Sequence, residues 1–301
     1  MKKYRIYQVD AFTRSRFYGN PAGVVANADG LTEEQMQQIA REMNNSETAF
    51  ILQSDSVEYD VEVRFFTPTT EVPICGHATI AAHYVRAIEG AAVSGQVRQK
   101  TKAGILPVEI IREDNDYSIV MTQGAPYVGN PLDSSVVQKI TAALGIDQAD
   151  LRNECPIAIS SAGHSKIMVG IKSNQQLHSL TPNMSALSTI SAEVGCNGYY
   201  VFTLNFKEKV LVHGRMFAPA IGISEDPVTG NANGPLGIYL VHYGICRDME
   251  SENELFFSIL QGEAIKRKGG MDVRVEIKNH NPILVKIVGQ AVVAFKTEID
   301  V

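Results

Sequence analysis

A short loop, P-I-C-G-H-A-T at residues 73–79, holds three residues that could do chemistry. Cys75 offers a thiol and His77 an imidazole, and Gly76 between them lets a ligand approach the backbone closely. An apolar segment follows directly and is expected to be a helix. The first amides of a helix lack partners within it and attract anions. The loop could therefore bind a small carboxylate, or it could simply turn the chain into its helix.

A second loop, E-D-P-V-T-G-N-A-N-G at residues 225–234, contains Asp226, Gly230 and Asn231. At an offset of 151 residues, Asp226 corresponds to Cys75. Two matched loops with polar side chains favour function over plain turns. Two helix starts facing each other across a cleft between domains would suit a small carboxylate. Neither loop has the glycine pattern of a nucleotide-phosphate site.

A third candidate is Glu47, in the segment N-N-S-E-T-A-F-I at residues 44–51. A carboxylate among apolar neighbours can have a raised pKa, which suits a general acid/base. Composition alone favours an ordinary solvated loop glutamate. At the same offset of 151 residues, however, the other half of the chain has Gly198. A carboxylate present in only one half suggests one proton-transfer group serving one site.

Cys75 could also act as a base of a cysteine-dependent racemase. A two-base thiol mechanism needs a second cysteine at the matching position, where this chain has Asp226. The mechanism is therefore not directly supported, and Cys75 is equally well interpreted as a small packed residue.

Other polar residues favour structural roles. Asn20 lies in G-N-P-A-G, residues 19–23, which predicts a tight turn between strands, although Asn20 could also contact a substrate. His83 and His242 fall within apolar helices and are expected to be satisfied core residues. The remaining histidines show no metal-ligand spacing with carboxylates: His164, His178, His213 and His280.

Internal similarity indicates how these residues are positioned. Three pairs of similar segments occur in the same order, at offsets of 151, 151 and 149 residues. The pairs are 64–68 with 215–219, 39–43 with 190–194, and 31–32 with 180–181. Shared patterning without common ancestry is the alternative, but a period of half the chain favours two similar domains.

The hydrophobic pattern predicts mixed α/β structure in each half. The expected strands are 4–9, 24–26, 48–52, 61–66, 108–112, 118–121, 199–204, 210–217, 271–277 and 283–295. Thr32 begins a capping box that opens a helix to about Met43. Residues 78–85 and 235–242 predict buried helices, the second with Pro235 in its first turn. Residues 127–134 have the composition of a linker.

Composition narrows the class of protein. The chain has 301 residues, 45% of them hydrophobic and 20% charged, and a net charge of −6. These values are typical of a globular protein and give no support to nucleic acid as a partner. No segment has the length of a membrane span or of a signal peptide's apolar region, and the four cysteines form no C-x-x-C pair. We therefore expect a cytoplasmic protein with free thiols and no membrane partner.

The motifs taken together resemble the PhzF family of phenazine-biosynthesis isomerase-like proteins, which share the diaminopimelate epimerase fold. The resemblance covers essentially the whole chain and is closest to the broad bacterial branch often called YddE-like. The motifs that carry it are V-D-A-F-T with G-N-P-A-G-V-V within 9–25, S-E-T-A-F at 46–50, F-T-P-T-T-E-V-P-I-C-G-H-A-T at 66–79, and E-D-P-V-T-G-N-A-N-G at 225–234.

The resemblance implies an α+β fold of two pseudo-symmetric domains, each a curled, mostly antiparallel sheet around a central helix. The expected domains are 1–127, completed by a last strand at about 291–301, and 128–290. Homodimers are common in such proteins. The phenazine enzyme isomerises a dihydro-hydroxyanthranilate without cofactor or metal, by proton transfer through a glutamate.

Carried over residue by residue, the resemblance implies that Glu47, His77 and Asp226 are catalytic. The residues that it and the loops suggest for substrate binding are Asn20, Ser46, Cys75, Gly76, Gly230 and Asn231. This chain has T-G-N where the phenazine pattern has T-G-S, and Cys75 where that branch tends to have a small apolar residue. Both departures put the phenazine substrate in doubt.

Three interpretations follow. The first is a cofactor-independent isomerase or epimerase for a small carboxylate bound between the domains, with Glu47 moving the proton. The second is a cysteine-dependent racemase that uses Cys75. The third is a small-molecule-binding protein that kept the fold and lost the reaction.

Overall fold

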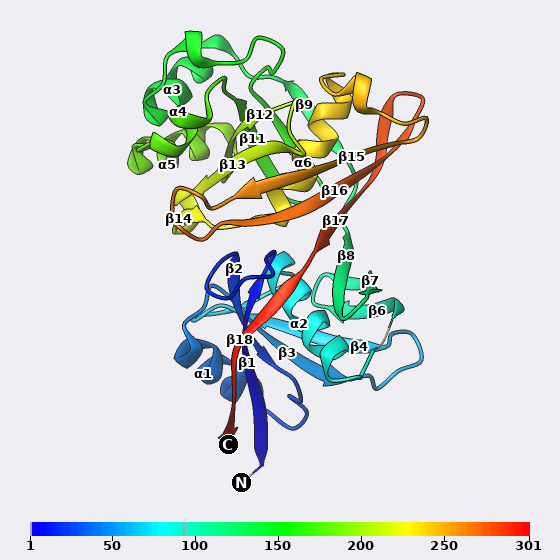
Figure 1. The fold of residues 1–301 in the computed structure, drawn as a ribbon. Helices are drawn as coiled ribbons and strands as arrows, with labels where there is room; N and C mark the ends of the chain where they lie inside the picture. The colour runs from blue at the N-terminus through cyan, green and yellow to red at the C-terminus, as the bar shows by residue number, and fades with distance from the viewer. Residues whose placement is uncertain (1, 93) are drawn as a thin grey trace. The chain divides into compact units, whose positions relative to one another are not determined.

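The computed structural model describes residues 2–92 and 94–301. It divides into two compact units, one of Met1–Thr122 with Val288–Val301 and one of Gln123–Ile287. Each unit is an α+β structure in which a curled, mostly antiparallel sheet surrounds a central helix, as the resemblance implies (Figure 1). Within the described ranges, no helix combines the length and apolar character that a membrane crossing requires.

The first unit contains the helices α1 (Glu33–Met43) and α2 (Gly76–Ile88). Its strands are β1 (Lys3–Ala11), β2 (Asn20–Val25), β3 (Thr48–Gln53), β4 (Val61–Phe66), β5 (Glu71–Val72), β6 (Gly95–Thr101), β7 (Gly104–Glu113), β8 (Asp116–Thr122) and β18 (Ala291–Asp300). The last strand of the chain therefore belongs to the first unit, where it pairs with β1.

The second unit contains the helices α3 (Ser134–Leu144), α4 (Asn174–Ser179), α5 (Met184–Val194) and α6 (Gly230–His242). Its strands are β9 (Tyr127–Pro131), β10 (Ala158–Ser161), β11 (Ser165–Gly170), β12 (Tyr199–Leu204), β13 (Val210–Ala218), β14 (Ile223–Asp226), β15 (Glu254–Gln261), β16 (Gly269–Lys278) and β17 (Asn281–Gly289), the last of which ends in the first unit. Short 3-10 turns occupy Gln148–Asp150, Pro219–Ile221 and Arg247–Met249.

The strand pairing repeats between the units. In the first, β1–β2, β3–β4 and β6–β7 are antiparallel, while β2–β3 and β4–β6 are parallel. In the second, β10–β11, β12–β13 and β15–β16 are antiparallel, while β11–β12 and β13–β15 are parallel. The same alternation in the same order agrees with the repeat found in the sequence.

Each unit is organised around a helix that is buried on nearly all sides. Ten of the thirteen residues of α2 are buried, and the helix contacts β1, β2, β3, β4, β7, β8 and β18. Such a helix must be apolar on nearly all sides, as the sequence of this segment predicts. The corresponding α6 begins at Gly230, five residues before Pro235. The prediction that Pro235 starts this helix was therefore wrong. The prediction that His242 is a satisfied core residue was also wrong, because His242 is exposed in the last turn.

Two further predictions fail along the sheets. Residues 127–134 are not a linker, because Tyr127–Pro131 forms β9 and pairs with β10, and α3 starts at Ser134. The single strand expected over 283–295 is two strands, β17 and β18, separated at Gln290. The side-chain amide of Gln290 forms hydrogen bonds through both its oxygen and its nitrogen. Its Oε1 accepts from Arg14, and its Nε2 donates to Glu113 and Ser118.

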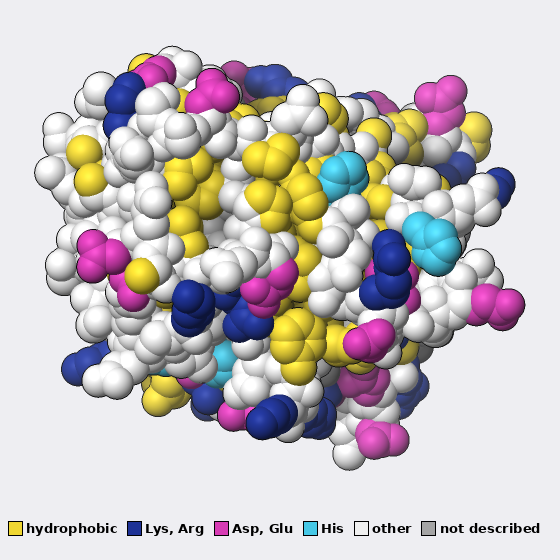
Figure 2. Space-filling model, turned by 90° about the horizontal axis from the view of Figure 1, so that it is seen from above, with side chains coloured by type: hydrophobic (Ala, Val, Ile, Leu, Met, Phe, Trp, Pro, Cys, Tyr) yellow, Lys and Arg dark blue, Asp and Glu magenta, His cyan; other side chains and the backbone are white. Residues whose placement is uncertain are grey.

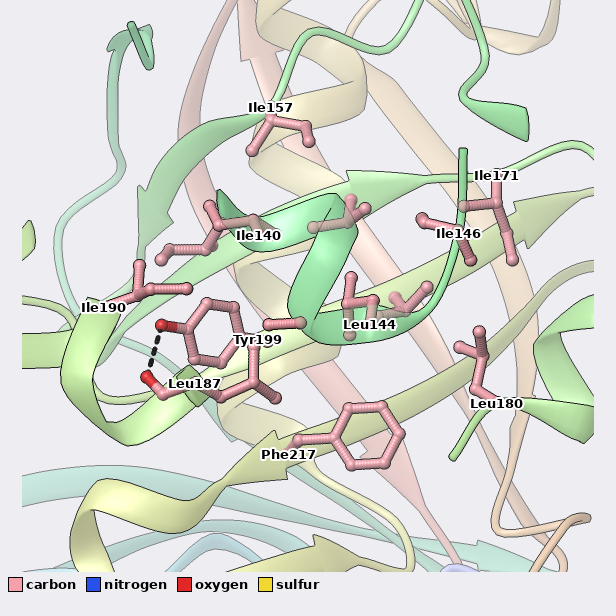
Figure 3. Close-up of a cluster of buried hydrophobic side chains, with 14 of the residues drawn as sticks. Ile140, Leu144, Ile146, Ile157, Ile171, Leu180, Leu187, Ile190, Tyr199 and Phe217 are labelled. Carbon is pink, nitrogen blue, oxygen red and sulfur yellow. Dashed lines mark hydrogen bonds between the residues drawn. The ribbon is translucent and has the colours of Figure 1, made fainter. Parts of the chain in front are cut away.

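The core of the second unit is a large aliphatic cluster that α3 and α5 cover (Figure 3). Tyr199 is fully buried within it and satisfies its hydroxyl locally. That hydroxyl donates to the carbonyl of Leu187 at 2.8 Å and accepts from Ser191 at 3.1 Å. Burial without a lost hydrogen bond is what permits a tyrosine at this place.

The surface mixes charges of both signs. On the face drawn in Figure 2, basic and acidic side chains are interspersed among polar and apolar ones. Exposed ion pairs such as Lys139 with Glu193, 2.7 Å apart, contribute at most about 1 kcal/mol each. Exposed pairs of this kind therefore contribute little to the stability of the fold.

His83, in the middle of α2, is a satisfied core histidine, as predicted. It is fully buried; Nε2 lies 2.6 Å from Gln99 Oε1, and Nδ1 lies 3.3 Å from Arg86 Nη1. Because Arg86 can only donate, the ring is neutral with its proton on Nε2. Burial, reinforced by Arg86 and opposed by the bond to Gln99, lowers the pKa of His83 to about 3.

This histidine should make stability fall in mild acid. Between pH 6.5 and 3 the unfolded chain binds a proton at His83 that the folded chain does not. The free energy of unfolding should then decrease by up to about 1.4 kcal/mol per pH unit from this group alone. Urea denaturation of wild type and His83→Gln at pH 7 and 5 measures the difference. Equal pH slopes in the two proteins would contradict the assignment.

Candidate active site

Glu47 is held at the junction of α1 and β3. Helix α1 is closed by its C-cap residue Asn44, which adopts a left-handed conformation with φ of 51°. The backbone amide of Gly23 then donates to the carbonyl of Glu47 at 3.2 Å, and the parallel pairing of β2 with β3 begins at the next residue. A Cβ at Gly23 would lie 2.7 Å from Oγ1 of Thr48, so glycine permits this close approach.

The start of α2 presents its loop residues to the same place. Cys75 is the N-cap residue, and its carbonyl accepts from both the amide and the hydroxyl of Thr79, at 3.0 and 2.7 Å. Gly76 and His77 form the first turn. A Cβ built on Gly76 would meet no atom within 4 Å among the described residues, so there is open space beside the first amides of the helix.

The two segments meet at the imidazole of His77. Its Nε2 lies 3.3 Å from Oε2 of Glu47 and 3.2 Å from Oγ of Ser46. Its Nδ1 lies 3.5 Å from Sγ of Cys75. The side chain of His77 is 9% exposed and that of Glu47 is 19% exposed, so both are largely shielded but accessible.

This arrangement can move protons. A neutral imidazole that carries its proton on Nε2 can donate to Glu47 and accept from the Cys75 thiol on Nδ1. Glu47 can then act as an oriented base, and Cys75 can act as a thiolate paired with His77. The donor atoms of Glu47, Cys75 and His77 also lie within 4.8 Å of one another and could hold a metal ion.

Asn20 is not in a turn. It is 1% exposed and is the first residue of β2, opposite Ala11 of β1. The reversal occurs earlier, and Gly19, with φ of 62°, completes it. A Cβ at Gly19 would come within 2.2 Å of the Ala11 carbonyl oxygen, which explains the glycine.

Asp10 was not predicted from the sequence as a residue of this region. It is buried, and its carboxylate accepts a hydrogen bond from the amide of Phe17 at 2.6 Å.

In the second unit, Asp226 ends β14 and is tied to the start of α6. Its carboxylate accepts a hydrogen bond from the hydroxyl of Thr229, the N-cap residue. Gly230 opens the helix, and the side-chain oxygen of Asn231 accepts from Gln123 at 3.4 Å. Asp226, Gly230 and Asn231 are therefore close together in this unit, as their sequence proximity implies.

The two helix starts show that the earlier matching of Cys75 with Asp226 was wrong. Both helices have thirteen residues, and Gly76 corresponds to Gly230, an offset of 154 rather than 151. Three additional residues lie between Phe217, the counterpart of Phe66, and the start of α6. The true counterpart of Cys75 is Thr229, so the second unit still lacks a matching cysteine.

A buried polar network that sequence reasoning missed supports the second loop. Gln261 Nε2 donates to the Asp226 carbonyl at 2.8 Å and to the Thr229 hydroxyl at 3.1 Å. Its Oε1 accepts from Asn233 at 3.0 Å, and Asn233 in turn accepts from the hydroxyl of Tyr200 at 2.6 Å. Asn233, a polar residue inside an apolar helix segment, was the one signal of this network in the sequence.

The counterpart of Glu47 is Gly198, as predicted. The amide of Ile167 donates to its carbonyl at 2.7 Å, repeating the bond from Gly23 to Glu47. The space left by the missing side chain is filled by Lys166, because a Cβ at Gly198 would lie 2.4 Å from Lys166 Cδ. Burial lowers the pKa of Lys166, while Cys196 and Asp226 oppose the shift. The second unit thus places the side chain of Lys166 where the first has that of Glu47.

The fit between Gly198 and Lys166 gives a stability prediction. Gly198→Ala should displace the lysine stem and lower the free energy of unfolding by about 1–3 kcal/mol. In a Lys166→Ala background the same change should cost less, with a coupling of about 0.5–3 kcal/mol. Urea denaturation of the four proteins measures this cycle, and additive effects would show that the contact is unimportant.

His178 and His213 have no metal-ligand spacing with a carboxylate in the sequence, yet both meet one in the structure. His178 and His213 both approach Glu263, with N···O distances of 3.3 and 2.6 Å. They are separated from it by 85 and 50 residues along the chain, so local spacing could not reveal the cluster.

Comparisons with known proteins identify the family of this chain and its fold. A family model described as phenazine biosynthesis-like protein matches residues 9–297. A Clostridium acetobutylicum protein named an uncharacterized isomerase is 56% identical, over 99% of both chains. The crystal structure of a Bacillus anthracis phenazine biosynthesis protein of the PhzF family has a TM-score of 0.89 and 33% identity, over 100% of both chains. A hydroxyproline epimerase from Agrobacterium vitis, at 11% identity, shares the fold, with a TM-score of 0.62 over 99% of this chain and 92% of that one.

Proposed function

Because the chain belongs to the phenazine biosynthesis-like PhzF family, we propose that it is an isomerase or epimerase acting on a small carboxylate-bearing substrate. The observation that carries this proposal is the contact between Glu47 and His77 beside the open start of α2. The proposed reaction uses acid/base proton transfer and needs neither metal nor cofactor.

In the proposed mechanism Glu47 takes a proton from a substrate carbon. The electron pair left behind moves toward the adjacent unsaturated group, and Glu47 returns the proton to another position or another face. No atom is gained or lost. His77 orients the carboxylate of Glu47 through its Nε2 contact. The first amides of α2, near Gly76, would bind substrate charge and oppose the charge that develops.

Roles for the other candidates follow from the resemblance. Ser46 and Cys75, which both contact His77, would line the site in the first unit. Asn20 would support the same region from β2. In the second unit, we propose that Asp226 contributes to proton transfer and that Gly230 and Asn231 bind substrate. Asp226→Asn tests this participation, because loss of activity in a folded variant requires that the second unit take part.

A cysteine-dependent racemase is the second candidate. The observation that favours it is the 3.5 Å distance between Cys75 Sγ and His77 Nδ1. Imidazole at this distance can stabilise a thiolate, the reactive form of cysteine.

Deuterium exchange distinguishes the candidates. Free amino acids, hydroxyproline and a dihydro-hydroxyanthranilate are incubated in D₂O with wild type, Glu47→Gln and Cys75→Ala, and incorporation is followed by NMR. Loss of exchange in Glu47→Gln alone supports the first proposal. Loss in Cys75→Ala, with Glu47→Gln still active, supports the racemase. A ligand that binds without exchange in any protein indicates a binding function instead.

We further propose that the protein is a cytoplasmic homodimer. The four cysteines are buried and none is joined in a disulfide among the described residues, which suits a reducing compartment. The dimer rests on the family resemblance, and light scattering on the purified protein tests it.

A further inference from the structure

We propose that His178, His213 and Glu263, in the second unit, form a binding site for a divalent transition-metal ion such as Zn²⁺. The proposal does not depend on the proposed function. The ligand atoms of the three side chains all lie within 4.8 Å of one another. One oxygen, Oε2 of Glu263, lies 2.6 Å from Nδ1 of His213 and 3.3 Å from Nε2 of His178. Two imidazoles and a carboxylate are a donor set that such ions prefer.

Three separate segments hold these side chains in place. His213 is inside β13, where it pairs with Leu260 of the parallel strand β15. Glu263 follows the end of β15, in a turn where Gly262 has φ of 80° and the amide of Arg267 bonds to its carbonyl at 2.9 Å. A Cβ at Gly262 would lie 2.5 Å from the Arg267 carbonyl oxygen, so the turn requires glycine.

His178 lies near the end of the short helix α4, which is anchored from both sides. Ser173 caps its start by accepting from the amide of Gln176 at 3.2 Å. At the other end, the Arg215 guanidinium donates to the carbonyls of Leu177 and Leu180 at 3.0 and 2.8 Å. Because the backbone on each side of His178 is fixed, its imidazole is held beside Glu263 at little entropic cost on binding.

The distances suit insertion of an ion. Zinc bonds to nitrogen and oxygen are about 2.0–2.2 Å long, so neighbouring ligands of a tetrahedral ion are about 3.4 Å apart. The pair His178–Glu263, at 3.3 Å, already has this spacing. The distance between His213 Nδ1 and Glu263 Oε2 must increase by less than about 1 Å to reach this spacing. A small rotation of the carboxylate provides the increase.

Exposure and surroundings set the expected affinity. The side chains of His178 and Glu263 are 38% and 23% exposed, so an ion can reach the cluster and water can complete its coordination. Nε2 of His213 is buried and has no hydrogen-bond partner among the described residues. Metal-bound histidines usually donate this second N–H, and losing such a partner costs about 10–100-fold in affinity. We therefore expect micromolar rather than nanomolar binding.

Titration with Zn²⁺ and Co²⁺ tests the proposal. The Glu47, Cys75 and His77 cluster is a competing donor set, so the titrations are made in a Cys75→Ala background. We expect one equivalent of metal to bind, and His178→Ala or Glu263→Gln to weaken binding by at least about tenfold. His280→Ala, which removes an exposed histidine outside the cluster, should leave binding unchanged.

Two outcomes would overturn the site. The first is absence of binding at millimolar Zn²⁺, with each variant as stable in thermal unfolding as its parent. The second is binding that survives in both His178→Ala and Glu263→Gln. With Co²⁺, the visible spectrum should show nitrogen and oxygen ligation in the Cys75→Ala protein. If metal binds only when Cys75 is present, with a near-ultraviolet thiolate band, the ion belongs to the other cluster and the proposal fails.

Discussion

Replacing Glu47 with glutamine should slow exchange of the substrate proton by at least about 10²–10⁴-fold. Glutamine has nearly the shape of glutamate and can still contact Nε2 of His77, but it cannot accept a proton from carbon. The loss should therefore fall on kcat, while KM changes little because the first amides of α2 still bind the substrate. Deuterium incorporation and steady-state kinetics on the substrate found in the exchange screen provide both values.

Two control variants make this result specific. Glu58→Gln changes an exposed glutamate in the loop between β3 and β4 and should leave exchange unchanged. Ser46→Ala removes the other Nε2 neighbour of His77 and should reduce the rate less than Glu47→Gln, because the base remains. A Glu47→Gln protein that folds normally and retains more than a tenth of the wild-type rate would contradict the assignment of Glu47 as the base.

Replacing Arg215 with alanine should be the most destabilising single change considered, at about 3–5 kcal/mol of unfolding free energy. The side chains of Arg215 and Glu225 are 8% and 9% exposed, and the guanidinium makes bonds of 2.9 and 2.7 Å to the carboxylate. Arg215 also bonds to two carbonyls at the end of α4. Its removal leaves a buried carboxylate without its cation, and urea denaturation measures the cost.

Arg64, at the same place in the first unit, provides the matched control. It pairs with Glu71, and its own side chain is 22% exposed. Glu71 also binds Lys102 at 2.7 Å, so in Arg64→Ala it keeps a cation. Arg64→Ala should therefore cost clearly less than Arg215→Ala. A double variant, Arg215→Met with Glu225→Leu, should recover much of the lost stability because no charge is left buried. Equal costs at the two arginines would refute the argument.

Features that depend on residues close together in the sequence were predicted correctly. The T-x-x-Q pattern at Thr32 forms a complete capping box, in which Thr32 and Gln35 bond to each other's amides. The apolar segment after His77 is a buried helix. The similar segments at 64–68 and 215–219 include the ends of β4 and β13, which are corresponding strands of the two units. In each case the signal is a spacing of a few residues, which is the scale on which helices and strands are specified.

The start of α6 shows where local rules fail. A proline inside a helix is normally excluded because it lacks the amide that the helix requires. Here Pro235 lies within α6, its carbonyl accepts from Ser160 at 2.7 Å, and the preceding Gly234 faces Gln123, whose Oε1 would lie 1.9 Å from a Cβ at that glycine. Gly234 and Pro235 are therefore packed against Gln123 and β10, contacts between distant residues that a local rule does not take into account.

The site clusters depend on contacts that no spacing rule detects. Glu47 and His77 were proposed separately and found in contact, whereas the approach of His178 and His213 to Glu263 was not anticipated. The offset of 151 residues identified Gly198 correctly but misassigned Asp226, because the insertion after β13 changes the register of the repeat. A single offset cannot represent an insertion within one half.

The pairing of β1 with β18 has a consequence for synthesis on the ribosome. Lys2 and Val301 exchange backbone hydrogen bonds of 3.2 and 3.1 Å, and the two ends of the chain lie side by side in Figure 1. The unit whose translation begins first is therefore completed only after the second unit has been translated, because its strand β18 follows the second unit in the chain. The second unit is one continuous segment of the chain, so it can form its core before β18 is available to pair with β1. Nascent chains will expose the edge of β1 that pairs with β18 until β18 has been translated, and an unpaired strand edge of this kind is prone to strand-to-strand association.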